Sequence, residues 1–124
     1  MKGDRILIDT NIAVYIFRGH AKLARELKGQ RPYVSSISRV ELLTWREADD
    51  AKVLMLETFL DGCELVRVNR QIEDIAIQLI RRYKLRLSDG LIAATAMAED
   101  LVLVSGDSAF LRVKEGLKLA HYRP

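Results

Sequence analysis

The sequence predicts an α/β fold, a three-layer α/β/α domain around a central, mostly parallel sheet of four or five strands. Short apolar runs alternate along the chain with longer segments whose apolar residues recur at helical spacing. Glycine, proline and polar residues that favour turns separate these segments. Strands that alternate with helices favour a parallel sheet covered on both faces. A chain of 124 residues suits one compact domain, so we expect a single domain over residues 1–124.

The first half of the chain is predicted to hold two strands and four helices. The apolar run at residues 6–8 is bounded by polar residues, which is typical of a buried strand. Thr10 or Asn11 can cap the helix that follows this run. A turn is expected at residues 29–32, which begin with glycine and end with proline. The predicted strands cover residues 6–8 and 33–35, and the predicted helices cover residues 12–17, 21–28, 37–47 and 49–60.

The second half begins with a strand and the clearest helix of the chain. Apolar residues from Ile72 to Tyr83 recur at helical spacing, with basic residues on the opposite side. The helix at residues 88–99 is rich in alanine, and such small side chains let a helix approach a sheet closely. The predicted strands cover residues 65–68, 101–104 and, at one edge, 117–120, and the predicted helices cover residues 72–83, 88–99 and 108–114.

Composition limits the classes of function. Twenty basic and seventeen acidic side chains give a net charge of +3, which is too small to predict nucleic-acid binding by itself. Cys63 is the only cysteine, so no internal disulfide forms and a cytoplasmic location is expected. His20 and His121 lie far apart, which disfavours a zinc site of the His and Cys kind. No apolar stretch has the roughly 18–20 residues that span a bilayer, so no membrane association is expected.

Four acidic residues stand where metal ligands would stand. Asp9 and Asp107 follow apolar runs almost directly, Glu41 lies one turn into the helix after the second strand, and Asp89 opens a later helix. In a parallel sheet all four approach one edge, beyond the carboxyl ends of the strands, where open α/β sheets bind ligands. Converging carboxylates repel one another unless a cation joins them. The first hypothesis is therefore an oxygen-ligand metal site, which suits Mg²⁺ or Mn²⁺.

Each acid also has a purely structural interpretation. Ser38 and Glu41 match a capping box. Asp89 follows a serine that can cap a helix, and in the structural interpretation it only complements the helix dipole. Asp9 and Asp107 could each cap a helix. The joint placement favours the metal site, because helix caps need not gather at one edge of a sheet.

Three segments, in this order and spacing, resemble the PIN-domain ribonucleases and, within them, the VapC-type toxins of toxin–antitoxin pairs. They are LIDTN at residues 7–11, SSISRVEL at residues 35–42 and LSDGLIAATA at residues 87–96. The resemblance extends over essentially the whole chain. It implies a Mg²⁺- or Mn²⁺-dependent endoribonuclease, the toxin of a type II pair. The acidic site that it implies is Asp9, Glu41, Asp89 and Asp107, with supporting hydroxyls from Thr10 and Ser105.

The last motif departs from the family pattern. The family often shows Thr-x-Asn-x-x-Asp-Phe, or Thr-x-Asp with a nearby Phe, whereas residues 105–110 read SGDSAF. Ser105 replaces threonine, and no acid directly precedes Phe110. Asp107 is therefore the local candidate for the fourth acid. We expect Asp9 and Asp89 to ligate the principal metal directly, and the other two acids to act through water or a second ion.

Substrate and partners follow from the same resemblance. An RNA substrate needs cations around an acidic pocket, and Arg82 and Arg86 are the candidates for phosphate contacts, although a solvated helix face explains them equally well. The resemblance implies a cognate antitoxin protein and a homodimer. Trp45 is interpreted as a core or interface residue, or as a lining of the cleft.

Three other classes of protein were weighed against this interpretation. A phosphoacceptor receiver needs an acidic pair after the first strand, and here Thr10 follows Asp9. A dinucleotide-binding domain needs a glycine-rich turn there, which the chain lacks. The alternative that stays open is a PIN scaffold that binds RNA or a protein without cleaving.

Overall fold

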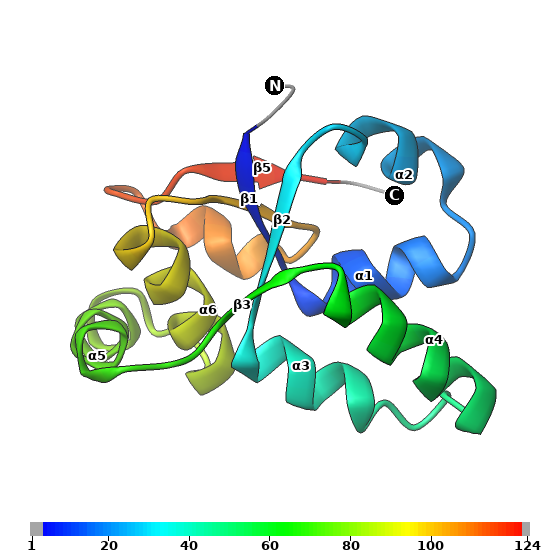
Figure 1. Cartoon of the computed structure of the whole chain (residues 1–124). Helices are drawn as coiled ribbons and strands as arrows, with labels where there is room; N and C mark the ends of the chain where they lie inside the picture. The colour runs from blue at the N-terminus through cyan, green and yellow to red at the C-terminus, as the bar shows by residue number, and fades with distance from the viewer. Residues whose placement is uncertain (1–3, 123–124) are drawn as a thin grey trace.

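The computed structural model describes residues 4–122, and the remaining residues of the predicted domain of residues 1–124 lie outside that part. Its centre is a five-stranded sheet in the order β3-β2-β1-β4-β5, and all four neighbouring pairs are parallel (Figure 1). The prediction of a mostly parallel sheet of four or five strands is thus confirmed. The strands are β1 (Arg5–Ile8), β2 (Arg31–Ser35), β3 (Glu64–Val66), β4 (Val102–Ser105) and β5 (Leu119–His121).

Six α-helices and one 3₁₀ helix connect the strands. None of the helices within residues 4–122 is long and apolar enough to cross a membrane. The helices are α1 (Thr10–Phe17), α2 (Ala21–Leu27), α3 (Ser36–Leu43), α4 (Asp50–Asp61), α5 (Arg70–Tyr83), α6 (Leu87–Ala98) and the 3₁₀ helix η1 (Ser108–Arg112).

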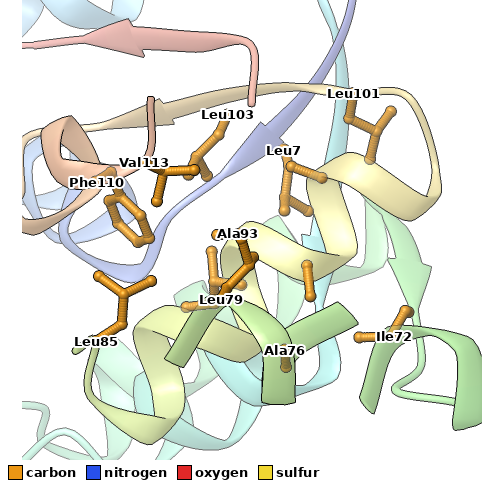
Figure 2. Close-up of a cluster of buried hydrophobic side chains, with 13 residues drawn as sticks. Leu7, Ile72, Ala76, Leu79, Leu85, Ala93, Leu101, Leu103, Phe110 and Val113 are labelled. Atoms are coloured by element: carbon orange, nitrogen blue, oxygen red, sulfur yellow. The ribbon is translucent and has the colours of Figure 1, made fainter. Parts of the chain in front are cut away.

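The sheet separates two apolar cores, which makes the fold a three-layer α/β/α arrangement. Side chains alternate along β1, so Leu7 faces one core while Ile6 and Ile8 face the other. Helices α5 and α6 cover the Leu7 face, and α1, α2 and α4 cover the opposite face (Figure 1). Figure 2 shows the core on the Leu7 side, where Phe110 of η1 is fully buried.

Helix α6 packs closely against α5 because Gly90 carries no side chain. A Cβ at this position would lie 2.3 Å from Cγ1 of Ile80 on α5. The close approach places the first turn of α6, which carries Asp89, beside the carboxyl end of the sheet. The small residues of α6 that predicted close packing are buried, among them Ala93, Ala94 and Ala96.

Several local expectations were wrong, most of them at helix caps. The side chain of Asp9, and not Thr10 or Asn11, caps α1. Ser35 caps α3, so Ser38 lies inside that helix and forms no capping box with Glu41. Arg86 occupies the N-cap position of α6 without a side-chain cap bond, so the serine before Asp89 is helical.

The observed ends of several helices and strands also differ from the expected ones. Residues 31–32, expected in a turn, begin β2 because Arg31 and Pro32 pair in register with β1. Helix α3 ends at Leu43, short of the expected residue 47. The segment at residues 108–114 is a 3₁₀ helix that ends at Arg112, and β5 begins at Leu119 instead of residue 117.

Candidate active site

The four predicted acids line one pocket of about 420 Å³ at the carboxyl edge of the sheet. Asp9 follows β1, and Asp107 lies between β4 and η1. Glu41 comes from α3 and Asp89 from the first turn of α6. The chain runs from β1 to β2 on one side and later places β4 on the other side of β1. The pocket therefore sits at a topological switch point, where open α/β sheets form ligand crevices.

Asp9 is the most buried of the four acids, with only 5% of its surface exposed. Its Oδ1 accepts a 2.8 Å hydrogen bond from the Thr10 amide, and its Oδ2 accepts a 2.6 Å bond from the Ser105 hydroxyl. Burial raises the pKa of Asp9 to about 6 despite these two bonds, and the charges of Asp89 and Glu41 add to the rise. A carboxylate in this position is stabilised by any cation that enters the pocket.

Ser105 connects the two strand ends that carry acids. Its buried hydroxyl donates to Asp9 and accepts a 3.0 Å bond from the Asp107 amide. Asn11 adds a second link, because its Oδ1 accepts a 3.3 Å bond from the Gly106 amide. Asp107 itself caps η1 through a 2.9 Å bond from the Ala109 amide. One Asp107 oxygen is thus used structurally, and the residue still lines the pocket.

Glu41 is held by hydroxyl groups from two elements. Thr10 Oγ1 lies 2.6 Å from Glu41 Oε1 and 3.0 Å from the Oγ of Ser38, which is fully buried. A hydroxyl has one proton, and the shorter contact directs that of Thr10 to the carboxylate. The Ser38 hydroxyl then donates to Thr10. The result is a relay of hydrogen bonds from Ser38 on α3 through Thr10 on α1 to Glu41 on α3. This relay fixes the carboxylate of Glu41 toward Asp9.

Removing the end of this relay gives a measurable expectation. Ser38→Ala should lower the turnover number of a reaction in this pocket about 5- to 10-fold, because a net hydrogen bond contributes about 1 kcal/mol. KM should change little, since Ser38 does not line the pocket, and the free energy of unfolding should fall by about 1 kcal/mol because the lost bond is buried. Ser38→Thr keeps the hydroxyl and serves as the matched control. Equal losses of kcat in both variants would contradict the relay.

Asp89 lies among charges of both signs. Burial and the nearby Asp107 raise the pKa of Asp89, while Arg86 and Arg112 oppose the rise. Arg86 lines the acidic pocket. Arg82, the other predicted RNA contact, does not line it; its guanidinium lies 3.7 Å from Glu115 and stacks over the Tyr83 ring.

Comparison with known proteins identifies the family. The family model of the PIN domain matches residues 6–116. The chain belongs to the PIN-domain family. A search of curated proteins finds no significant match to this PIN domain.

Solved structures with the same fold cover nearly the whole chain. A toxin–antitoxin complex from Klebsiella pneumoniae matches with a TM-score of 0.84 and 22% identity, covering 96% of this chain and 99% of that one. VapBC2 from Rickettsia felis, bound to a promoter DNA fragment, matches with a TM-score of 0.81 and 22% identity, covering 95% and 98%. FitAcB from Neisseria gonorrhoeae matches with a TM-score of 0.78 and 21% identity, covering 92% and 95%.

The pocket of this PIN domain has the chemistry of a site for a hard divalent cation. All four acids supply oxygen donors, and both Asp9 and Asp89 have raised pKa values that a cation would relieve. Within residues 4–122, no group of three or more His, Cys, Asp or Glu side chains is placed to hold an ion, so the four acids do not form a cage made of protein ligands alone. Mg²⁺ needs no such cage, because it keeps several waters and uses one or two carboxylates together with substrate phosphate. The residues therefore fit Mg²⁺ or Mn²⁺.

Three residues of the site escaped the sequence analysis in this role. Arg18 follows α1 and lines the acidic pocket, and Arg112 lies close enough to Asp89 to affect its pKa. Ser38 was assigned to a capping box, although it supports Thr10. The spacing of Ser38 one turn before Glu41 was a usable signal, whereas nothing in the sequence connected Arg112 to Asp89.

Proposed function

We propose that this PIN domain is a Mg²⁺- or Mn²⁺-dependent endoribonuclease that hydrolyses phosphodiester bonds in RNA. The observation that carries the proposal is the gathering of Asp9, Glu41, Asp89 and Asp107 in one pocket at the switch point of the sheet. These acids come from four separate segments. Two of them have raised pKa values, so their placement costs free energy unless a cation is bound.

Each residue has a distinct role in the proposed site. Asp9 and Asp89 would hold the principal ion directly, and Glu41 and Asp107 would hold it through water or hold a second ion. When bound, the ion would offset phosphate charge and acidify an attacking water. Ser105 keeps Asp9 oriented through its 2.6 Å bond, and Thr10 does the same for Glu41.

Basic residues at the rim supply the attraction for RNA. Arg86 lines the acidic pocket, and Arg18 lines it on the α1 side. Guanidinium groups bind phosphate oxygens and offset the repulsion between a polyanion and the carboxylates. We propose Arg86 as a phosphate contact. Arg82 remains a proposed contact for RNA farther from the pocket.

We further propose that the chain is the toxin of a type II pair and binds a cognate antitoxin protein. The similar structures from Klebsiella pneumoniae and Rickettsia felis are a toxin–antitoxin complex and a DNA-bound VapBC2. An apolar groove between α1 and α4, lined by Phe17, Trp45 and Met55, offers a place for an antitoxin segment. Arg18 lines both this groove and the acidic pocket, so a bound segment would lie next to the proposed catalytic site.

A homodimer is the second proposed assembly. Val40 on α3 and Leu87 on α6 are 58% and 71% exposed, and these two helices contact each other beside the acidic pocket. Exposed apolar side chains of this size favour burial against another chain. Light scattering of the purified protein, with Val40→Asp and Leu87→Asp as variants, tests this assembly.

Cleavage of a pooled RNA is the test of the proposed function. The wild-type protein should cut RNA with Mg²⁺ or Mn²⁺ and should stop when EDTA is added. The pool must contain transfer, messenger and ribosomal RNA, so that a narrow target is represented. A folded protein that binds Mg²⁺ and RNA but leaves every RNA in the pool intact would instead be a non-cleaving PIN scaffold.

A further inference from the structure

A second, smaller pocket adjoins the acidic pocket. It has a volume of about 180 Å³ and shares Arg86, Asp89 and Asp107 with its larger neighbour. Its remaining lining comes from η1, namely Ser108, Ala109 and Arg112. The two pockets are therefore neighbours that share Arg86, Asp89 and Asp107 as a common wall.

Arg112 is fixed at the mouth of this smaller pocket. Its Nη1 donates a 3.2 Å hydrogen bond to the Lys84 carbonyl. Lys84 has the left-handed backbone conformation that ends α5, with a φ of 55°. The bond ties η1 to the short connection that carries Arg86 into α6. Both arginines line the smaller pocket together with Asp89.

Neither arginine forms a salt bridge within the described residues. Within residues 4–122 the ion pairs involve Arg18, Arg70, Arg82 and Lys118, and neither Arg86 nor Arg112 takes part in one. Both act on Asp89 through their charge without forming a salt bridge with it. Each of these two guanidinium groups keeps several N–H donors free for an anion, beside the carboxylates of Asp89 and Asp107 that line the same pocket.

We propose that this pocket is a phosphate subsite, in which Arg112 and Arg86 bind the phosphodiester next to the one that is cleaved. The inference rests on the proposed ribonuclease function and assigns a position to the substrate. Ser108 and Ala109 are small and leave room for phosphate oxygens. None of the six lining residues is aromatic, so the pocket lacks the rings on which bases stack.

The subsite explains how a polyanion is placed over four carboxylates. The scissile phosphate lies in the acidic pocket, and the neighbouring phosphate is attracted by Arg112. Binding at a phosphate that does not react fixes the register of the RNA chain, and such remote contacts lower the barrier by positioning the reacting group. Arg112 is accordingly a positioning residue, and Arg86 touches both phosphates.

A neutral-phosphate scan tests this assignment. In a series of short RNAs with one known cleavage site, each RNA carries one uncharged methylphosphonate, placed at a different position along the chain and next to a 2′-O-methyl sugar. Matched control RNAs carry the same modified sugar with a natural phosphate. Wild-type protein should lose about 10- to 100-fold in kcat/KM at one position adjacent to the cleaved bond, the range expected for a charge-assisted hydrogen bond.

Arg112→Ala should show the same loss of kcat/KM on natural RNA. A methylphosphonate at the sensitive position should then cause no further loss in this variant. Arg112→Lys keeps the charge and should recover part of the activity. Arg31→Ala is the matched control, because Arg31 is exposed at the opposite edge of the sheet, where β2 begins. This control should behave as wild type at every modified position.

Binding of the same RNAs without cleavage separates the two proposals. Fluorescence anisotropy in EDTA measures the affinity of wild type and of Arg112→Ala for the methylphosphonate RNAs and for the matched natural RNAs. The subsite is therefore tested even if the wild type cuts nothing. If the loss caused by Arg112→Ala and the loss caused by the methylphosphonate multiply at every position, the subsite is overturned and the proposed nuclease function is not affected. Absence of metal-dependent cleavage, with the position-specific binding effect retained, would overturn the nuclease and keep the subsite.

Discussion

Asp89→Asn should lower the rate of metal-dependent RNA cleavage by about 1000-fold, which corresponds to about 4 kcal/mol of barrier. Asparagine keeps the size of the side chain and removes the charge. Asp89 is one of two proposed direct ligands, and its carboxyl is close enough to Asp107 and Glu41 to feel their charges. The loss should appear in kcat and should not be recovered at high RNA concentration, because Arg86 remains to bind the substrate.

The same substitution should leave the metal-free protein as stable as the wild type or more stable. Asp89 lies in the first turn of α6, where a negative charge is worth about 0.3–1 kcal/mol. Burial and the charge of Asp107 act in the opposite direction and raise its pKa. A large fall in the free energy of unfolding would therefore indicate that Asp89 mainly stabilises the helix.

Asp61→Asn is the matched control for activity. Asp61 is exposed at the end of α4, near the start of β3 and so at the opposite edge of the sheet from the acids. Urea unfolding in EDTA and single-turnover cleavage with Mg²⁺, measured on both variants, provide the comparison. A cleavage rate of Asp89→Asn within tenfold of the wild type would contradict its assignment as a direct ligand.

Much of the fold could be predicted because it depends on local patterns. Buried parallel strands are short and apolar, so residues 6–8 and 101–104 stood out between polar segments. The convergence of Asp9 and Asp107 followed from topology, since both leave adjacent parallel strands at the same end. The amphipathic pattern of α5 is strong because one of its faces packs on α6 while the opposite face meets solvent.

Caps and hydroxyl contacts could not be predicted, because several residues satisfied the same local rule. Ser35, Ser36 and Ser38 could each begin α3, and the choice depends on where β2 ends. Once Ser35 takes the cap, the hydroxyl of Ser38 is free to contact Thr10, which lies 28 residues away. Arg112 was missed for a similar reason, since its anchor on the Lys84 carbonyl lies 28 residues away.

The second large expectation concerns Asp9 and the pH dependence of stability in the metal-free protein. The folded-state pKa of Asp9 is about 6, above the ordinary value of 3.8 that applies to the unfolded chain. The folded protein therefore holds the proton more tightly than the unfolded chain does. The stability that this proton confers is complete below pH 3.8 and is lost as the pH rises through 6. The loss attributable to Asp9 amounts to about 3 kcal/mol.

Asp9→Asn removes this titration and keeps a residue that caps helices well. The difference in free energy of unfolding, variant minus wild type, should rise by about 2.4 kcal/mol between pH 4 and pH 7, which is most of the full loss. Taking the difference cancels the titrating groups that do not interact with Asp9, and referring it to its value at pH 4 cancels any constant change in the bond to Ser105. Urea unfolding in EDTA at half-unit steps of pH gives both curves. Parallel curves would show that Asp9 is not forced to ionise in a buried site.

Addition of Mg²⁺ at pH 7 provides the complementary result. A ligand that binds only the folded state stabilises it by an amount that grows with its concentration. Wild-type protein should therefore recover stability with Mg²⁺ at pH 7, whereas Asp9→Asn should respond weakly, because one of the two proposed direct ligands is lost. Near pH 4 the protonated wild type should also respond weakly. A carboxylate that destabilises the empty site and gains stability with the ion behaves as a metal ligand. If Asp9 acted only as the cap of α1, it would stabilise the protein at neutral pH with or without Mg²⁺.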